Sequence, residues 1–153
     1  MKEQIFIRNA MPSDLEAVIA LDDTTPVAEK QAYWNGIFEH YVNCGHNGCH
    51  FLVAEISDKF VGFIVGEVRA WEFGSTPCGW VFALSVSSRH RKMGVGQRMF
   101  EEICKCLKAA GAAAIRTMVE RDNKLTLSFF RNQGLSSGRY VELESSLVSA
   151  AKD

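Results

Sequence analysis

The chain has 153 residues, of which 47% are hydrophobic and 23% are charged, and this composition predicts a single globular domain over residues 1–153. The formal net charge of −1 argues against a general attraction to nucleic acid. No apolar run approaches the roughly 20 residues of a membrane span, so we expect no membrane partner and a cytoplasmic location.

The first half of the chain reads as a strand, two helices and a hairpin. Residues 5–8 read as a strand, and Pro12 suits the first turn of a helix whose apolar face ends at Asp22. A weaker helical pattern covers residues 27–42. Two further strands, within 51–56 and 60–66, are joined closely enough to form a hairpin.

The second half alternates strands with helices. Residues 79–86 are apolar on both faces, which predicts a central strand. An apolar stripe predicts a helix over 97–110, ended by Gly111, and residues 113–119 read as a buried strand.

A last helix and strand complete the predicted order. Residues 123–133 predict a helix stopped by Gly134, and residues 139–143 predict a final strand. The fold class is therefore α/β (α+β), with a mixed, mostly antiparallel sheet and flanking helices.

Two glycines mark the turn between the central strand and the helix that follows it. The turn reads Arg91, Lys92, Met93, Gly94, Val95, Gly96. Backbone N–H groups at a helix start are unpaired and lie at the positive end of the helix dipole, so the turn predicts an anion site. Residues 89–108 carry six Lys and Arg against two Asp and Glu, whereas residues 1–88 carry five against eleven. The local positive charge favours an anionic cofactor, and the acidic first half is compatible with a cationic substrate or with a solvated surface.

The spacing Arg-x-x-Gly-x-Gly resembles the pyrophosphate-binding signature of the GNAT acyltransferase superfamily, which binds acetyl-CoA. The predicted order of strands and helices is similar to that fold over nearly the whole chain. A second similar feature lies downstream, where Asn123 leads to the aromatic pair Phe129-Phe130 and then to Gly134-Leu135.

The resemblance implies that acetyl-CoA lies where the fourth and fifth strands splay apart. Backbone groups of Leu84 and Val86 would pair with the pantetheine arm. Asn123 would bind the same arm, and Phe130 would lie near the thioester. The pyrophosphate would be held by a run of backbone N–H groups, those of Arg91, Lys92, Met93, Gly94, Val95 and Gly96, with Gln97 at the helix start.

The resemblance also implies catalytic roles, and here the chain departs from the family pattern. The Val86 N–H would donate to the thioester carbonyl oxygen. Many relatives have a tyrosine acid where this chain has Phe130, and some have a glutamate base where it has Trp80. Other groups must then transfer protons, and Glu67 as base and Tyr140 as acid are the leading candidates.

Further carboxylates remain alternatives to Glu67. Glu72 lies in the loop after the third strand, and Glu120 lies after the fifth. Because coenzyme A thiolate is a good leaving group, the missing tyrosine need not abolish turnover.

These features predict an N-acetyltransferase that moves an acetyl group from acetyl-CoA to a small amine or a protein N-terminus. An α-amine, with a reference pKa of about 7.7–8.0 against about 10.4 for lysine, needs less help from a base. The alternative is a non-catalytic acyl-CoA-binding protein of the same fold. A homodimer is compatible with either function.

Several cysteines and histidines are candidates for metal or redox sites. The run at 44–50 holds two cysteines and two histidines, but its spacing is too tight for easy fourfold chelation, so we expect no metal. Cys104 and Cys106 point to different helical faces. Five cysteines, an odd number, favour reduced thiols.

Overall fold

The computed structural model describes residues 3–43 and 48–148. These residues belong to two compact units, Met1–Met118 and Val119–Asp153. The expectation of one domain over residues 1–153 therefore stays a prediction. Part of the Cys and His run, residues 44–47, lies outside the described residues.

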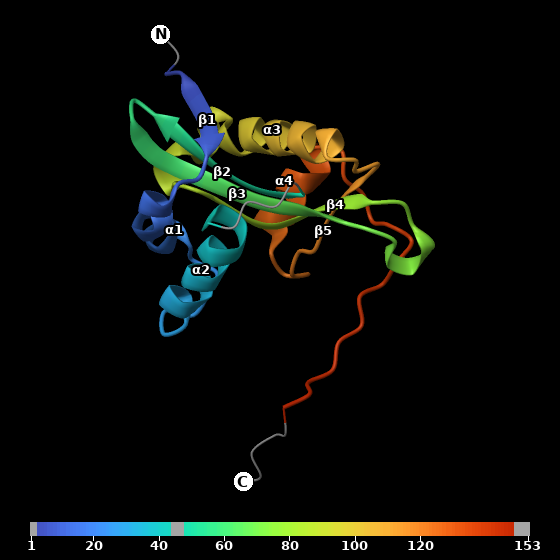
Figure 1. Cartoon of the computed structure of the whole chain (residues 1–153). Helices are drawn as coiled ribbons and strands as arrows, with labels where there is room; N and C mark the ends of the chain where they lie inside the picture. Colours follow the sequence, from blue (N-terminus) through green and yellow to red (C-terminus); the bar gives the residue numbers. More distant parts are fainter. Residues whose placement is uncertain (1–2, 44–47, 149–153) are drawn as a thin grey trace. The chain divides into compact units, whose positions relative to one another are not determined.

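A five-stranded mixed sheet forms the centre of the first unit (Figure 1), in the order β1-β2-β3-β4-β5. The pairs β1–β2, β2–β3 and β3–β4 are antiparallel, whereas β5 runs parallel to β4. The strands are β1 (Ile5–Asn9), β2 (Cys49–Ile56), β3 (Lys59–Arg69), β4 (Cys78–Val86) and β5 (Ile115–Thr117). This architecture confirms the predicted fold class.

Helices cover both faces of the sheet, with α1 and α2 on one face and α3 on the other (Figure 1). The helices of the first unit are α1 (Leu15–Leu21), α2 (Lys30–Phe38) and α3 (Val95–Ala109). Short helical turns join them to the strands: η1 (Pro12–Asp14), η2 (Glu39–Asn43), η3 (Glu72–Gly74) and η4 (Ser88–Met93). The second unit contains α4 (Lys124–Asn132).

Close approach of α3 to the sheet depends on glycine. A Cβ atom on Gly66 would lie 3.0 Å from Ile103 Cδ1 and 3.0 Å from the Trp80 carbonyl oxygen, which is tighter than side chains pack. Met99, Ile103 and Leu107 are almost fully buried on this helix. The apolar stripe predicted for the helix is therefore the face that packs on the sheet.

Aromatic side chains fill the opposite face, between the sheet and α2. Trp34 and Phe38 are buried there with Phe51 and Phe63. The Trp34 ring centroid is 5.2 Å from that of Phe63, and the Phe38 centroid is 5.1 Å from that of Phe51, both in edge-to-face geometry. This aromatic layer holds α2 and the segment after it against the sheet.

A buried carboxylate at the end of α1 fixes the start of the loop to α2. Asp22 is 2% exposed and accepts hydrogen bonds from Trp34 Nε1 at 2.8 Å and from the Thr24 backbone N–H at 2.9 Å. Burial alone would raise the pKa of Asp22, but hydrogen bonds from Thr25, Thr24 and Trp34 outweigh it and lower the pKa to about 2.

Asp22→Ala should lower the free energy of unfolding by about 2–3 kcal/mol, because it leaves the buried Trp34 N–H without its acceptor. The folded-state pKa lies below the unfolded value of about 3.9, so this contribution is present above about pH 4 and is lost as the pH falls toward 2. Urea titrations at pH 7 and pH 3 measure both effects. Asp23, the exposed neighbour of Asp22, provides the control. Asp23→Ala should change the free energy of unfolding by about 0.5 kcal/mol or less. Equal stability of the two variants at pH 7 would contradict the anchoring role.

Two sequence predictions about the second half are wrong. The fifth strand is shorter than predicted, because only Ile115–Thr117 pairs with β4, and Ala113 and Ala114 are exposed. Residues 139–143 form no strand, and Val141 and Leu143 are 77% and 90% exposed. The alternation of polar and apolar residues there has no neighbouring strand to pair with among the described residues.

Candidate active site

The second half of β4 has an edge that β5 does not cover. β5 pairs with β4 only over Gly79–Val81, and Thr117 Oγ1 donates to the Val81 carbonyl oxygen at 2.8 Å where the pairing stops. β4 continues to Val86, and within the described residues no other strand pairs with that edge. This geometry supports the predicted splay between the fourth and fifth strands.

A bulge determines which backbone groups point to the uncovered edge. The register of β4 against β3 shifts between Val65 and Gly66. Val65 faces Ala83 but Gly66 faces Val81, which leaves Phe82 as the extra residue of the bulge.

Successive backbone N–H groups of a strand point to opposite edges, so one known hydrogen bond fixes the direction of the N–H groups on either side of it. Ser87 N–H donates to the Val61 carbonyl oxygen of β3 at 2.7 Å. The N–H groups of Leu84 and Val86 therefore point away from β3, toward the uncovered edge. An extended ligand arm lying there would meet the two residues predicted to bind it.

The glycine turn begins shortly after this edge. Gly94 has φ +82° and is the N-cap residue of α3, so the turn uses a left-handed conformation that glycine adopts without strain. Arg98 N–H donates to the Gly94 carbonyl oxygen at 3.0 Å, and the first turn of α3 contains no acidic residue. The N–H groups of Val95, Gly96 and Gln97 precede this first intrahelical bond and mark the positive end of the helix.

Side chains of the predicted phosphate turn differ in what they contact. Val95 is fully buried and can offer a ligand only its backbone. Gln97 Nε2 donates to Glu101 Oε1 at 3.0 Å, along the helix. Lys92 and Met93 are exposed.

Arg91 lies at the boundary between the turn and the uncovered edge. Its Nε donates to the Val86 carbonyl oxygen at 3.4 Å, and its Nη2 is 3.8 Å from Asp23 Oδ2. The guanidinium thus lies next to one of the two predicted arm-binding residues.

Glu67, near the end of β3, lies beside the start of β4. It is paired with Trp80 across the strands, on the face covered by α2. Tyr41 Oη donates to Glu67 Oε2 at 3.0 Å, and Arg69 Nε donates to Glu67 Oε1 at 3.1 Å. The Glu67 side chain is 19% exposed, so the carboxylate is accessible yet held at both oxygens.

The indole of Trp80 has two cations nearby. The Arg69 guanidinium carbon is 5.0 Å from its ring centroid and that of Arg116 is 5.9 Å away. Trp80 Nε1 is buried and has no hydrogen-bond partner among the described residues.

The alternative carboxylates are less well placed. Glu72 Oε1 is 4.0 Å from Arg69 Nε in the loop after β3, where Trp71 and Phe73 are strongly exposed. Glu120 is exposed and follows Thr117 by three residues, in the second unit.

The second unit carries the remaining predicted site residues. Asn123 Oδ1 accepts from the Thr126 N–H at 3.1 Å and so caps α4, a structural role that the sequence did not indicate. Phe130 is 5% exposed, with its ring centroid 5.2 Å from that of Phe129. Their contacts with a cofactor stay predictions.

Tyr140 is not on a strand, contrary to the prediction. It is 41% exposed, and its hydroxyl oxygen accepts from Arg139 Nη2 at 2.8 Å. Its proposed role as an acid loses the structural reason for which it was predicted.

Tyr41, Arg69 and Thr117 were not predicted as site residues. Tyr41 was assigned only to a weak helical pattern, and its contact with Glu67 joins residues 26 positions apart. The raised pKa of Tyr41 follows from its burial and from the nearby Glu67 carboxylate. The same two causes raise the pKa of the Cys49 thiol, which lies opposite Glu67 on β2.

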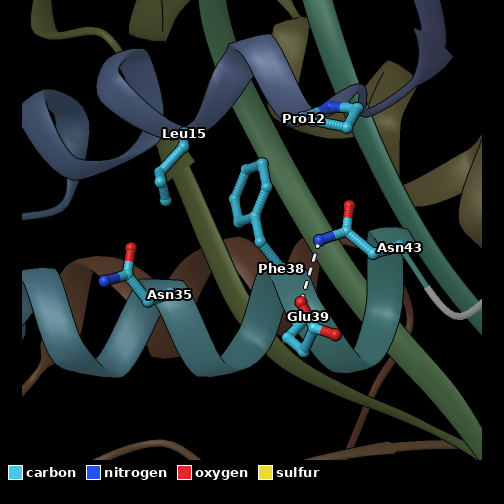
Figure 2. A pocket seen from close by; sticks show the side chains of 6 residues that line it. All are labelled: Pro12, Leu15, Asn35, Phe38, Glu39 and Asn43. Atoms are coloured by element: carbon cyan, nitrogen blue, oxygen red, sulfur yellow. Dashed lines mark hydrogen bonds between the residues drawn. The ribbon is translucent and has the colours of Figure 1, made fainter.

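A separate depression lies between the segment of η1 and α1 and the segment of α2 and η2 (Figure 2). It has a volume of about 260 Å³ and is lined by Pro12, Leu15, Asn35, Phe38, Glu39 and Asn43. Asn43 Nδ2 donates to Glu39 Oε2 at 3.1 Å across its rim. None of the predicted site residues contributes to it.

Metal, thiol and membrane features add little to this site. Within residues 3–43 and 48–148, no three His, Cys, Asp or Glu side chains are grouped as metal ligands would be. Cys49, Cys78, Cys104 and Cys106 are free thiols. In the same part of the chain, no helix has the length and apolar character needed to cross a membrane.

The fold is that of the GNAT acetyltransferases, and the sequence comparison agrees. The family model described as Acetyltransferase (GNAT) family matches residues 15–135, so the chain belongs to the GNAT family.

Curated proteins and many solved structures are similar to the chain. L-2,4-diaminobutyric acid acetyltransferase from Nocardia farcinica (strain IFM 10152) is 29% identical over 79 residues, which cover 52% of this chain and 39% of that enzyme. A transcriptional regulator from Bacillus halodurans C-125 matches with a TM-score of 0.78 and 16% identity, over 94% of this chain and 100% of its own. Aminoglycoside N-acetyltransferase AAC(6')-Iy, in complex with CoA, matches with a TM-score of 0.78 and 14% identity, over 97% and 98%. At these identities the structural likeness concerns the fold.

Proposed function

We propose that the chain is an acetyl-CoA-dependent N-acetyltransferase that acts on a primary amine. The observation that carries the proposal is the uncovered edge of β4, which leads into the positive end of α3. An extended arm followed by a pyrophosphate, as in acetyl-CoA, matches a strand edge followed by a turn of N–H donors. The CoA complex of the similar aminoglycoside acetyltransferase supports the same cofactor.

In this proposal the cofactor is bound mainly by backbone. Leu84 and Val86 pair with the pantetheine arm, and the turn from Arg91 to Gly96, with Gln97, holds the pyrophosphate. Asn123 and Phe130 are the further cofactor contacts that the family resemblance implies. The Arg91 side chain, which donates to the Val86 carbonyl oxygen in this structure, turns toward the phosphates when the cofactor is bound.

The reaction is a direct attack of a neutral amine on the thioester carbonyl carbon. A C–N bond forms and the C–S bond breaks, so the coenzyme A thiolate leaves and takes up a proton. The Val86 N–H stabilises the developing oxyanion, and Glu67 accepts the proton that the amine loses. Tyr140 as the acid stays a prediction with no support from its position.

The acceptor is a small amine or a protein N-terminus. Diaminobutyric acid and aminoglycosides, which the names of two similar enzymes specify, are both amines and support this class. Because the matched part of the diaminobutyrate enzyme is 39% of its length, its particular substrate does not transfer to this chain. A cytoplasmic location and a homodimer are parts of the proposal that rest on the sequence.

A non-catalytic acyl-CoA-binding protein is the second candidate. Phe130, which has no proton to give, stands where many relatives have a tyrosine acid, and Trp80 stands where some have a glutamate base. This protein would bind acetyl-CoA with the same residues and leave the thioester intact.

Incubation with acetyl-CoA and a panel of amines and peptides tests the proposal. We expect mass spectrometry to detect a product heavier by one acetyl group, with release of free coenzyme A thiol. Calorimetry with acetyl-CoA is run in parallel. Tight binding without transfer to any amine would favour the second candidate, and absence of both would refute the proposed function.

A further inference from the structure

Tyr41 occupies an unusual place in the first unit, on the short π-helical turn η2 between α2 and β2. π-helical turns are rare and often occur at functional sites. The Tyr41 ring centroid is 5.2 Å from that of Phe82, the extra residue of the β4 bulge. The side chain therefore links the segment after α2 to the part of β4 where the uncovered edge begins.

The Tyr41 hydroxyl reaches the carboxylate of Glu67 from this position. The hydrogen bond to Oε2 is 3.0 Å long, and Arg69 holds the other oxygen at 3.1 Å. Two donors, one on each oxygen, fix the orientation of the carboxylate beside Trp80. A single donor would leave it free to rotate.

We infer that Tyr41 is a positioning residue for Glu67 in acetyl transfer, holding the carboxylate toward the start of β4. The inference rests on the proposed function. Burial and the Glu67 charge raise the pKa of Tyr41, so the phenol keeps its proton and stays a donor across the pH range of an assay.

Other charged or titratable groups surround this pair. Cys49 lies opposite Glu67 on β2, and the His40 ring centroid is 4.6 Å from that of Tyr41. Arg69 lies between Glu67 and Glu72, and Arg116 of β5 faces the Trp80 ring. Among these neighbours, Tyr41 alone donates to Glu67 Oε2 through an uncharged hydroxyl. Removing that hydroxyl therefore leaves the formal charge of the cluster unchanged.

Tyr41→Phe keeps the ring against Phe82 and removes only the hydroxyl. We expect kcat to fall by roughly tenfold, as the loss of a hydrogen bond to a charged group predicts. The KM for acetyl-CoA should stay unchanged.

Tyr33→Phe is the matched control, since it removes a hydroxyl from α2 at a side chain that is 42% exposed. It should leave kcat unchanged. In a Glu67→Gln background, Tyr41→Phe should have no further effect on kcat, because Tyr41 acts through Glu67.

Parental kcat in Tyr41→Phe would overturn the inference and leave the proposed function standing. A parent chain that acetylates no amine would refute the function itself. If Tyr41→Phe does not fold, ultraviolet titration of the tyrosines replaces the kinetics. One phenol should ionise at lower pH in Glu67→Gln than in the parent, and identical titrations would also overturn the inference.

Discussion

Glu67→Gln should lower kcat for acetyl transfer by roughly 10²–10⁴-fold at neutral pH, the range that general-base catalysis contributes. Glutamine keeps the shape of the side chain, and its amide oxygen can still accept from one of the two donors, Tyr41 and Arg69, that hold the carboxylate. It cannot take a proton from the amine. Activity should recover in part at high pH, where more of the amine is already neutral. Steady-state kinetics with the best acceptor from the panel, between about pH 6 and pH 10, measure the effect.

Two further variants separate loss of the base from a general change of charge. Glu102→Gln removes an exposed carboxylate of α3, which pairs only loosely with Lys105 at 3.8 Å, and should leave kcat at the parental value. Glu72→Gln tests the alternative base in the loop after β3. Parental activity of Glu67→Gln at every pH, with a loss in Glu72→Gln, would move the role to Glu72. Parental activity in both would mean that the base lies elsewhere or that the acceptor arrives already neutral.

The fold was largely predictable because its elements follow local patterns. The buried stripe of α3 is a strong periodic signal, and β2 and β3 are short, nearly continuous apolar runs. Both patterns are borne out by the packing of Ile103, Val53 and Phe63. The glycine turn was predictable for a different reason. Gly94 has a positive φ that few other residues tolerate, so the sequence marks the conformation directly.

The errors occur where pairing with a distant segment decides the structure. Residues 113–119 are largely apolar, but only Ile115–Thr117 pairs with β4, because the pairing of β4 and β5 ends at Val81. Residues 139–143 alternate as a strand would, but alternation predicts a strand only where a neighbouring edge accepts it.

The contact between Tyr41 and Glu67 could not have been read from spacing. It depends on the antiparallel register of β2 and β3 and on the π-helical turn that follows α2. Neither has a sequence signature as direct as that of a glycine with positive φ. The chemistry of Glu67 was therefore predictable as a candidate, whereas the residue that orients it required the fold.

Gly96→Val should weaken acetyl-CoA binding by roughly tenfold or more, which corresponds to about 1.4 kcal/mol. Gly96 lies in the first turn of α3, two residues after Gly94, where the proposed pyrophosphate approaches the backbone. A branched side chain there occupies the space that the phosphate oxygens need. Gly96 is the better position for this test, because valine at Gly94 would also have to adopt φ +82° and would strain the turn.

The fold should survive Gly96→Val, since valine is more favourable than glycine inside a helix. Gly36→Val is the matched control. Gly36 lies within α2, where an added Cβ atom would meet no other atom within 4 Å, and it belongs to none of the proposed contacts. Calorimetric titration with acetyl-CoA, together with thermal unfolding of each variant, separates loss of binding from loss of fold. Unchanged affinity in a folded Gly96→Val protein would mean that the turn does not hold the pyrophosphate, and the cofactor site would have to lie elsewhere on the chain.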